Sequence, residues 1–280
     1  MAAGLNLSRA LLALAVAAGG SYTYAFEPVS LSGEPSLKLQ WQSAKEDGRR
    51  PAIIALHGCG GLYDSRGRFD DRYTWYAQRW NAAGWHVVAP DSFGSRGQGS
   101  ICTQAPMDRT IKVTHRREDV LRTAAWLVQR NDVDPQRIAI VGWSHGGSTA
   151  LELADRSLWL SQPPAAIVMY YPGCSGWKNR PLGKPTAPML MLLGDADDWT
   201  PAAACKDLAE RYQSEHPGTV LVYSYADSYH GFDRPGPVRF LANIPAGVDK
   251  RGVHVGGNAA ARASALTELD RFLTHYLQPE

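Results

Sequence analysis

Short apolar runs alternate along the chain with longer segments in which apolar residues recur at helical spacing. Apolar runs of five or six residues, bounded by turn residues, are typical of strands buried within a sheet. The pattern predicts strands near residues 37–41, 52–56, 86–90, 137–141, 166–171, 188–193 and 220–225, and helices near 72–83, 115–130, 145–156, 201–215 and 258–277. This alternation indicates an α/β fold with a mostly parallel, doubly wound sheet that is flanked by helices.

Two segments, residues 94–110 and 233–257, carry no periodicity and are rich in glycine or proline, so both are predicted to be loops. Ligands of open α/β sheets bind beyond the carboxyl ends of the strands, where the first of these loops must emerge. We therefore expect these long loops to shape a ligand pocket.

Length and composition favour one globular domain. The chain has 280 residues, of which 44% are hydrophobic, enough for a single α/β domain over residues 26–280. The net charge is only +2 and no basic cluster is interleaved with aromatic residues, which argues against nucleic acid as a partner. No cysteine and histidine set has zinc spacing, so neither a metal nor another cofactor is expected.

The amino terminus has the features of a signal peptide. Arg9 precedes an apolar run over residues 10–18 that is too short to span a bilayer, and Thr23 and Ala25 place small residues at a cleavage site. We expect residues 1–25 to be removed after export, leaving a secreted or periplasmic protein with no stable membrane association. An uncleaved amino-terminal anchor is the alternative, which the short apolar run disfavours.

A serine lies on a predicted strand-to-helix turn. Residues 142–146 read Gly-Trp-Ser-His-Gly, directly after the strand at 137–141 and before a helical segment. This is the nucleophile elbow pattern, in which glycines permit a tight turn that lifts the serine, here Ser144, above the sheet. The flanking strand and helix make the pattern more specific than the five residues alone.

A serine hydroxyl needs a base and an acid to become a nucleophile, and both follow in the sequence. An acidic loop over residues 194–201 follows one predicted strand, and His230 follows the next. Asp227 lies too close to His230 on the same loop to orient it. The order of serine, acid and histidine is that of α/β-hydrolases.

Five segments together resemble the dienelactone hydrolase family, which has the α/β-hydrolase fold. They are the glycine-rich loop at residues 56–62, Pro-Asp-Ser-Phe at 90–93, the elbow, the acidic loop and Tyr-His-Gly-Phe-Asp at 229–233. The resemblance implies that Ser144 is the nucleophile and His230 the general base. It favours Asp197 as the acid, because the family's aspartate lies four residues before a proline, here Pro201. Asp198 is the rival and Asp195 is less favoured.

The resemblance also implies an oxyanion hole made of two backbone amides. One is the amide of His145, directly after the nucleophile, and the other is assigned by family alignment to Cys59. Because main-chain groups do this work, the side chains of His145 and Cys59 are expected to be chemically idle. His57 is expected to brace the loop.

The chain departs from the family in ways that bear on substrate. The dienelactone enzymes use a cysteine nucleophile and an acid in the oxyanion loop, whereas Ser144 and Gly58 stand at these positions here. This favours ordinary ester hydrolysis over dienelactone as the true substrate. The family also has an arginine that contacts a substrate carboxylate, and Arg96 lies near the corresponding position in this sequence. The alternative is that Arg96 is a solvated loop residue with no contact to substrate.

Four cysteines in an exported protein suggest disulfides. Cys174 and Cys205 follow neighbouring strands and form the preferred pair, which leaves Cys59 and Cys102 as a second bridge. The sequence allows three connectivities, and free buried cysteines are the alternative.

These observations predict a serine hydrolase that cleaves carboxylic esters of small molecules through an acyl-enzyme intermediate. A peptidase or amidase of the same fold and a dienelactone or lactone hydrolase are alternatives, because the motifs do not encode the leaving group. A binding protein that has lost turnover is a further alternative, against which the intact set of serine, acid and histidine argues.

Overall fold

A computed structural model of the chain describes residues 26–160 and 162–278. The signal peptide predicted over residues 1–25 lies outside the described residues. No helix in the described ranges is both long enough and apolar enough to span a membrane.

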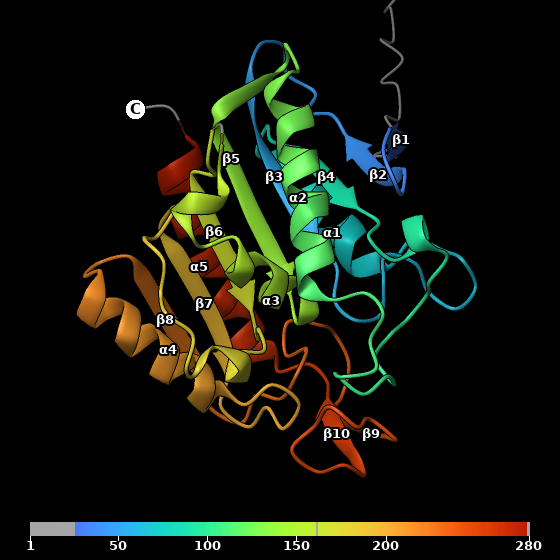
Figure 1. Cartoon of the computed structure of the whole chain (residues 1–280), viewed down its shortest axis with the longest axis vertical. Coiled ribbons are helices and arrows are strands. Elements are labelled where there is room, and N and C mark those ends of the chain that lie inside the picture. The colour runs from blue at the N-terminus through green and yellow to red at the C-terminus, as the bar shows by residue number, and fades with distance from the viewer. Residues whose placement is uncertain (1–25, 161, 279–280) are drawn as a thin grey trace, which may run out of the picture.

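An eight-stranded sheet forms the centre of the molecule (Figure 1). Its strands lie in the order β1-β2-β4-β3-β5-β6-β7-β8. The pairs from β4 to β8 are parallel, whereas β2 runs antiparallel to β4 and β1 antiparallel to β2. The strands are β1 (Glu27–Leu31), β2 (Leu37–Gln42), β3 (Arg50–Leu56), β4 (His86–Pro90), β5 (Val133–Trp143), β6 (Ala166–Tyr170), β7 (Met189–Gly194) and β8 (Val220–Tyr225).

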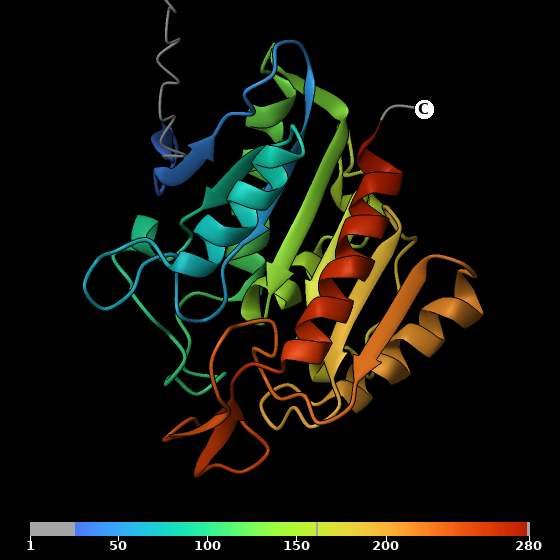
Figure 2. The ribbon, with the colours of Figure 1, turned by 180° about the vertical axis from the view of Figure 1, so that it is seen from behind.

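Helices cover both faces of this sheet, which confirms the predicted doubly wound α/β class. The helices are α1 (Asp71–Ala82), α2 (Val113–Val128), α3 (His145–Glu152), α4 (Ala202–Glu215) and α5 (Ala259–Leu277). In Figure 1, α2, α3 and α4 lie in front of the sheet, and Figure 2 shows α1 and α5 on the opposite face. Short 3-10 turns lie at Gly94–Arg96, Arg156–Leu158 and Ser175–Trp177.

The sheet separates two apolar cores. Successive side chains of a strand point to opposite faces, so Ile54 of β3 packs beneath α2 while Ile53 packs against the layer of α1 and α5. The central strands are buried on both faces, which explains why they read as continuous apolar runs. The sheet thereby fixes where the loops at its carboxyl edge emerge.

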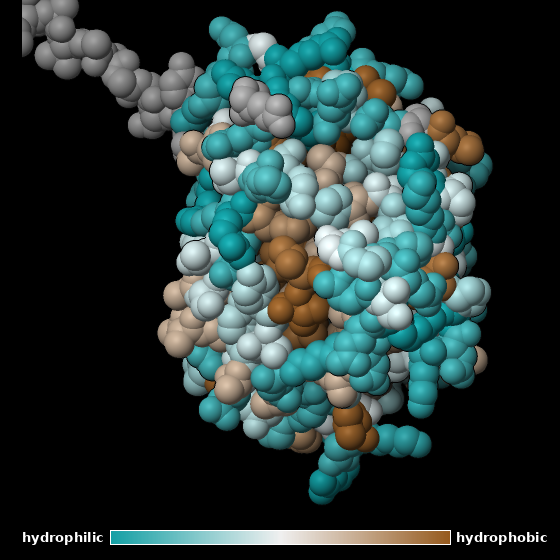
Figure 3. All heavy atoms as spheres, turned by 90° about the vertical axis from the view of Figure 1, so that its left-hand side faces the viewer, coloured by the Kyte–Doolittle hydropathy of each residue, from teal (hydrophilic) through white to brown (hydrophobic). Residues whose placement is uncertain are grey.

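The edge strand β8 is less covered than the central strands. Leu221 is 44% exposed and lines, with Tyr223 and Phe272, a cavity of about 420 Å³ against α5. Figure 3 shows the side of the molecule that includes this edge, where apolar residues form a hollow area bordered by hydrophilic ones.

The segment 233–257 was predicted to be a loop, and this prediction is wrong in part. It contains a two-stranded antiparallel hairpin, β9 (Arg239–Ala242) and β10 (Gly252–Val255). Each strand has only four residues, too few for alternation to be recognised in the sequence. The hairpin lies at the carboxyl edge of the main sheet, where the amide of Gly256 donates to the carbonyl of His230 (3.1 Å) (Figure 1).

Both predicted disulfides are present. Cys174, after β6, is joined to Cys205 of α4, and Cys59, after β3, is joined to Cys102 in the loop after β4. The described residues contain no free cysteine. Each bridge ties a loop at the carboxyl edge of the sheet to a more distant segment.

Candidate active site

Ser144 occupies the sharp turn between β5 and α3. Its backbone has φ 55° and ψ −118°, a conformation that is costly for a residue with a side chain. Two glycines allow the turn to pack this closely. A Cβ on Gly142 would lie 2.3 Å from the carbonyl oxygen of Gly146, and a Cβ on Gly146 would lie 2.1 Å from that of Leu56.

The structure brings the predicted histidine and the predicted acid to this serine. The Nε2 atom of His230 lies 2.8 Å from the Ser144 hydroxyl, and its Nδ1 atom lies 2.8 Å from Oδ2 of Asp197. A carboxylate only accepts, so Nδ1 carries the imidazole proton and Nε2 presents its lone pair to the hydroxyl. The imidazole is therefore oriented to take a proton from the serine.

The carboxylate of Asp197 is itself held in place. Its Oδ1 atom accepts hydrogen bonds from the amides of Trp199 (2.9 Å) and Thr200 (2.8 Å), and its Oδ2 atom accepts one from the Thr200 hydroxyl (3.1 Å). Asp197 is only 5% exposed. These hydrogen bonds fix the direction of the Asp197 carboxylate toward His230.

The other candidate acids have different partners. Asp198 pairs with His254 of the hairpin, at 2.7 Å between Oδ2 and Nδ1, and Asp195 forms an ion pair with Lys206 (2.7 Å). Neither carboxylate is directed at His230.

The loop of His230 is anchored by a buried carboxylate that the sequence analysis did not single out. Asp233 accepts from the hydroxyls of Tyr171 (2.5 Å) and Tyr76 (3.1 Å), and from Arg72 (3.3 Å). The Tyr171 ring lies 4.6 Å from the His230 ring. The last residue of the Tyr-His-Gly-Phe-Asp motif was the available signal, because an aspartate beside apolar residues needs buried partners.

Ser144, His145 and Cys59 line one cavity of about 450 Å³. Trp177 and Trp199 supply aromatic walls, and the ion pair of Glu152 with Arg180 (2.5 Å) lies at its border. The predicted oxyanion donors thus belong to residues that border the same space as the serine. A cavity of this volume is of the size that small-molecule sites have.

Arg96 does not reach this cavity. It forms a two-pronged ion pair with the buried Asp119 of α2, at 2.7 and 2.9 Å, and also donates to the carbonyl of Ser92 (2.8 Å). The family-based expectation that Arg96 contacts substrate is therefore not supported by its position. Two other cations, Arg109 and Lys112, line the cavity instead.

His57 braces the oxyanion loop. Its Nδ1 atom lies 2.8 Å from the carbonyl oxygen of Gly58, to which it donates, and its ring meets the ring of Phe93 at 4.5 Å. Burial, together with the positive charge of Arg116, lowers the pKa of His57 well below its usual value. The ring is therefore neutral and serves as a structural donor. Among the described residues, no group of three or more His, Cys, Asp or Glu could hold a metal ion.

A model of the dienelactone hydrolase family matches residues 40–277. The chain belongs to this family. A search of curated proteins finds no match. The match extends from β2 to the end of α5 and so includes every residue of the site described above.

Solved structures of other proteins share the fold. One is a dienelactone hydrolase-like promiscuous phosphotriesterase from metagenomic libraries, with 20% identity, a TM-score of 0.71 and coverage of 91% of this chain and 99% of that chain. Another is esterase 2 of Thermogutta terrifontis phosphorylated by paraoxon, with 19% identity, a TM-score of 0.62 and coverage of 91% and 96%. A third is an α/β-hydrolase enzyme from a Medee basin deep-sea metagenome, with 16% identity, a TM-score of 0.57 and coverage of 91% and 99%.

Proposed function

We propose that this dienelactone hydrolase family member is a serine hydrolase that cleaves carboxylic esters. The observation that carries the proposal is the continuous hydrogen-bonded series from Asp197 through His230 to Ser144, which ends on a serine held at positive φ. A serine activated in this way is suited to attack at a carbonyl carbon.

In the proposed reaction, the Ser144 oxygen attacks the ester carbonyl while its proton passes to Nε2 of His230. Asp197 stabilises the resulting imidazolium without accepting its proton. The negative charge that develops on the carbonyl oxygen is stabilised by the amides of Cys59 and His145. Collapse of the tetrahedral intermediate releases the alcohol, which takes the proton from His230.

Hydrolysis of the acyl-enzyme repeats these steps with water. His230 takes a proton from a water molecule, the hydroxide attacks the acyl carbonyl, and collapse returns the proton to Ser144. These residues complete both half-reactions without a cofactor.

Turnover of a p-nitrophenyl ester series, from acetate upward, tests the proposal. We expect the purified mature protein to hydrolyse the series and Ser144→Ala to lose at least about 10⁴-fold in kcat. The chain-length profile would measure how much of the 450 Å³ cavity the acyl group fills. Equal turnover by both proteins would refute Ser144 as the nucleophile.

A fluorophosphonate probe gives an independent test, for which Ser148 provides a matched control. Ser148 lines the same cavity, but its hydroxyl donates to the carbonyl of Ser144 (3.2 Å). We expect the probe to label wild type and Ser148→Ala but not Ser144→Ala. That a related esterase is described as phosphorylated by paraoxon supports the choice of this chemistry.

The same triad would also act on amides or lactones, so the leaving group must be measured. Comparing p-nitrophenyl acetate with the corresponding p-nitroanilide separates an esterase from an amidase, and dienelactone is the substrate to add. Faster turnover of the anilide would replace the ester assignment. Failure of all substrates together with failure of labelling would indicate a binding protein.

We further propose that the enzyme works outside the cytoplasm. Two disulfides support this location, because such bonds persist in oxidising compartments. The apolar run over residues 10–18 and the small residues at the expected cleavage site near Ala25 support export by a signal peptide.

A further inference from the structure

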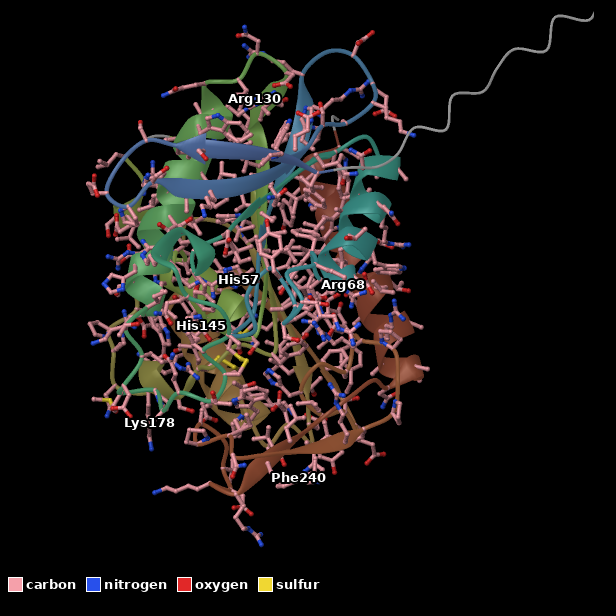
Figure 4. The ribbon with its side chains drawn as sticks, turned by 90° about the vertical axis from the view of Figure 1, so that its right-hand side faces the viewer. His57, Arg68, Arg130, His145, Lys178 and Phe240 are labelled. Carbon is pink, nitrogen blue, oxygen red and sulfur yellow. A yellow bond between two sulfur atoms is a disulfide. The ribbon has the colours of Figure 1, made fainter. Side chains whose placement is uncertain are left out.

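The side chain of His145 has no part in the mechanism above, although it borders the cavity. His145 is the first residue of α3 and follows the nucleophile directly. The residue is 8% exposed and lines the cavity together with Ser144. Figure 4 labels it close to His57, beside the glycine-rich loop.

A buried arginine determines which nitrogen of His145 carries the proton. Arg116 of α2 is 1% exposed, and its Nη1 atom lies 2.7 Å from Nδ1 of His145. Its Nη2 atom donates to the carbonyl of His57 (2.6 Å). Burial lowers the pKa of Arg116 to about 10, so the guanidinium is still charged at neutral pH. Since a guanidinium can only donate, Nδ1 of His145 must accept.

The imidazole of His145 is neutral in this setting. Burial lowers its pKa well below the usual value, and the positive charges of Arg116 and Arg109 act in the same direction. A neutral ring that accepts at Nδ1 holds its single proton at Nε2. The ring therefore offers one N–H donor.

No partner within the described residues uses this donor. The hydrogen bonds of the His145 ring in residues 26–160 and 162–278 are confined to the Nδ1 contact with Arg116. Nε2 is not among the fully buried, unpartnered atoms of these residues, so it keeps some accessible surface. Because His145 borders the cavity, that surface is available to a bound molecule.

Arg109 provides a cation on the same wall. It lines the cavity, is in none of the ion pairs of the described residues, and lies close enough to His145 for its charge to lower the pKa of that ring. Its Nε atom is buried without a hydrogen-bond partner in the described part of the chain. An oxygen near His145 would thus meet a neutral N–H donor and a positive charge, which favours an anionic acceptor.

We propose that Arg116 holds His145 as its Nε2–H tautomer and that this N–H donates to an oxygen of the substrate other than the reacting carbonyl. The inference rests on the proposed ester hydrolysis and names the substrate class as esters with a second, preferably anionic, oxygen group near the scissile bond. His145 contacts substrate, and Arg116 is a positioning residue.

Two pairs of esters test the acceptor on either side of the scissile bond. On the acyl side, monoethyl succinate carries a carboxylate where ethyl 4-methylpentanoate carries an isopropyl group of similar shape. On the alcohol side, O-acetylglycolate carries a carboxylate where isobutyl acetate carries an isopropyl group. Turnover of all four is followed by proton release, and the ratio of kcat/KM within each pair measures the preference for the oxygen group.

Two variants of His145 separate the donor from the packing. His145→Gln keeps an amide N–H at about the reach of Nε2. His145→Asn keeps an acceptor at the level of Nδ1 for Arg116, but its shorter side chain places no N–H at the position of Nε2. We expect wild type to prefer the carboxylate ester in at least one pair. We expect His145→Asn to reduce that ratio about tenfold and His145→Gln to keep it within about threefold. Equal ratios in wild type and His145→Asn for both pairs would overturn the proposal.

The tautomer can be observed without any substrate. In protein labelled with ¹⁵N-histidine, the signals that disappear in His145→Asn belong to His145. We expect them to show a protonated Nε2 and an unprotonated Nδ1 at neutral pH, and a proton on Nδ1 would refute the role of Arg116.

Failure of the proposed function would look different from failure of this inference. If the chain is not an ester hydrolase, wild type would turn over none of the four esters or the p-nitrophenyl series, and Ser144 would resist the fluorophosphonate. If only the inference about His145 is wrong, wild type would hydrolyse esters and react with the fluorophosphonate. The His145 variants would then show the same kcat/KM ratios within each ester pair as wild type.

Discussion

A glycine two residues after Ser144 matters as much as the serine for the shape of the turn. Gly146 lies in the first turn of α3, and its missing side chain lets this turn approach the end of β3. The close contact connects the helix of the nucleophile to the strand before the oxyanion loop. The position of Ser144 therefore depends on backbone packing between two elements.

Substituting Gly146 with alanine should destabilise the fold. The added Cβ would lie 2.1 Å from the carbonyl oxygen of Leu56, so a backbone segment must move. We expect a loss of about 3 kcal/mol in the free energy of unfolding, measured by urea denaturation. Gly99→Ala is the control, because nothing lies within 4 Å of its added Cβ. Similar values for the two variants would contradict this account of the elbow.

The buried His57 should make stability depend on pH. Its pKa is well below the usual value in the folded protein, whereas the unfolded chain takes up a proton below about pH 6.5. Its contribution to stability is therefore complete above pH 6.5 and is lost as the pH falls. We expect His57 to lower the free energy of unfolding by up to about 1.4 kcal/mol per pH unit between pH 6.5 and 5. This contribution should be absent in His57→Gln. Equal slopes for wild type and variant in urea titrations would argue against it.

Sequence reasoning at this scale succeeded where a local pattern imposes geometry. The proximity of Ser144 and His230 could be predicted, because a strand-to-helix turn places the serine and the loop after β8 places the histidine. The spacing to Pro201 favoured Asp197 but left Asp198 as a rival, because the partner of Asp198, His254, lies 56 residues further along the chain. Arg116 was not predicted for the same reason, because its contact with His57 spans 59 residues.

At the scale of elements, the strands and helices were largely predictable and the connections were not. All seven expected strands appear within a few residues of their predicted bounds. The central strands β3 and β7 were the plainest, because burial on both faces makes their sequences largely apolar. The strand β1 was missed. It lies at the sheet edge with mostly exposed residues, and its sequence therefore lacks an apolar run. The hairpin of β9 and β10 was missed because its strands are short.

The two disulfides should have similar effects on stability and different effects on activity. They close segments of 43 and 31 residues, so each is expected to contribute about 4 kcal/mol. Only the bridge of Cys59 holds the oxyanion loop, to which the amide of Ile101 also bonds (2.9 Å). We expect Cys59→Ser/Cys102→Ser to lose about tenfold in kcat/KM, since a displaced oxyanion donor weakens transition-state binding.

The double variant Cys174→Ser/Cys205→Ser is the matched control. It should show a similar fall in the urea midpoint while its kcat/KM stays within about threefold of wild type. Equal losses of activity in the two double variants would mean that general loosening, and not the oxyanion loop, is responsible.

The whole molecule consists of a sheet between two apolar cores, with the candidate chemistry gathered at one edge. The fold is shared with solved structures at 16 to 20% identity. The order of apolar runs in the sequence was sufficient to predict the layers. It could not predict the cavity, whose walls come from loops after several strands.

Export concerns the whole chain and can be tested directly. Expressed in full in a bacterial host, the protein should be recovered from the periplasm or medium with an amino terminus at or near Phe26. The first strand begins at Glu27, so cleavage there leaves the described sheet intact. Mass spectrometry of the amino-terminal peptide is the measurement. An intact amino terminus in the membrane fraction would instead support an uncleaved anchor.

The hydrogen bond between Ser144 and His230 joins residues that are 86 positions apart. A ribosome adds about 5 to 20 residues per second, so the serine leaves it roughly 4 to 17 seconds before its base. During that interval, and in any product that ends before residue 230, the Ser144 hydroxyl has no His230 imidazole to take its proton. In the proposed mechanism, hydrolysis thus begins only after residue 230 has been made, and shorter copies do not act on the esters of the cell that makes them.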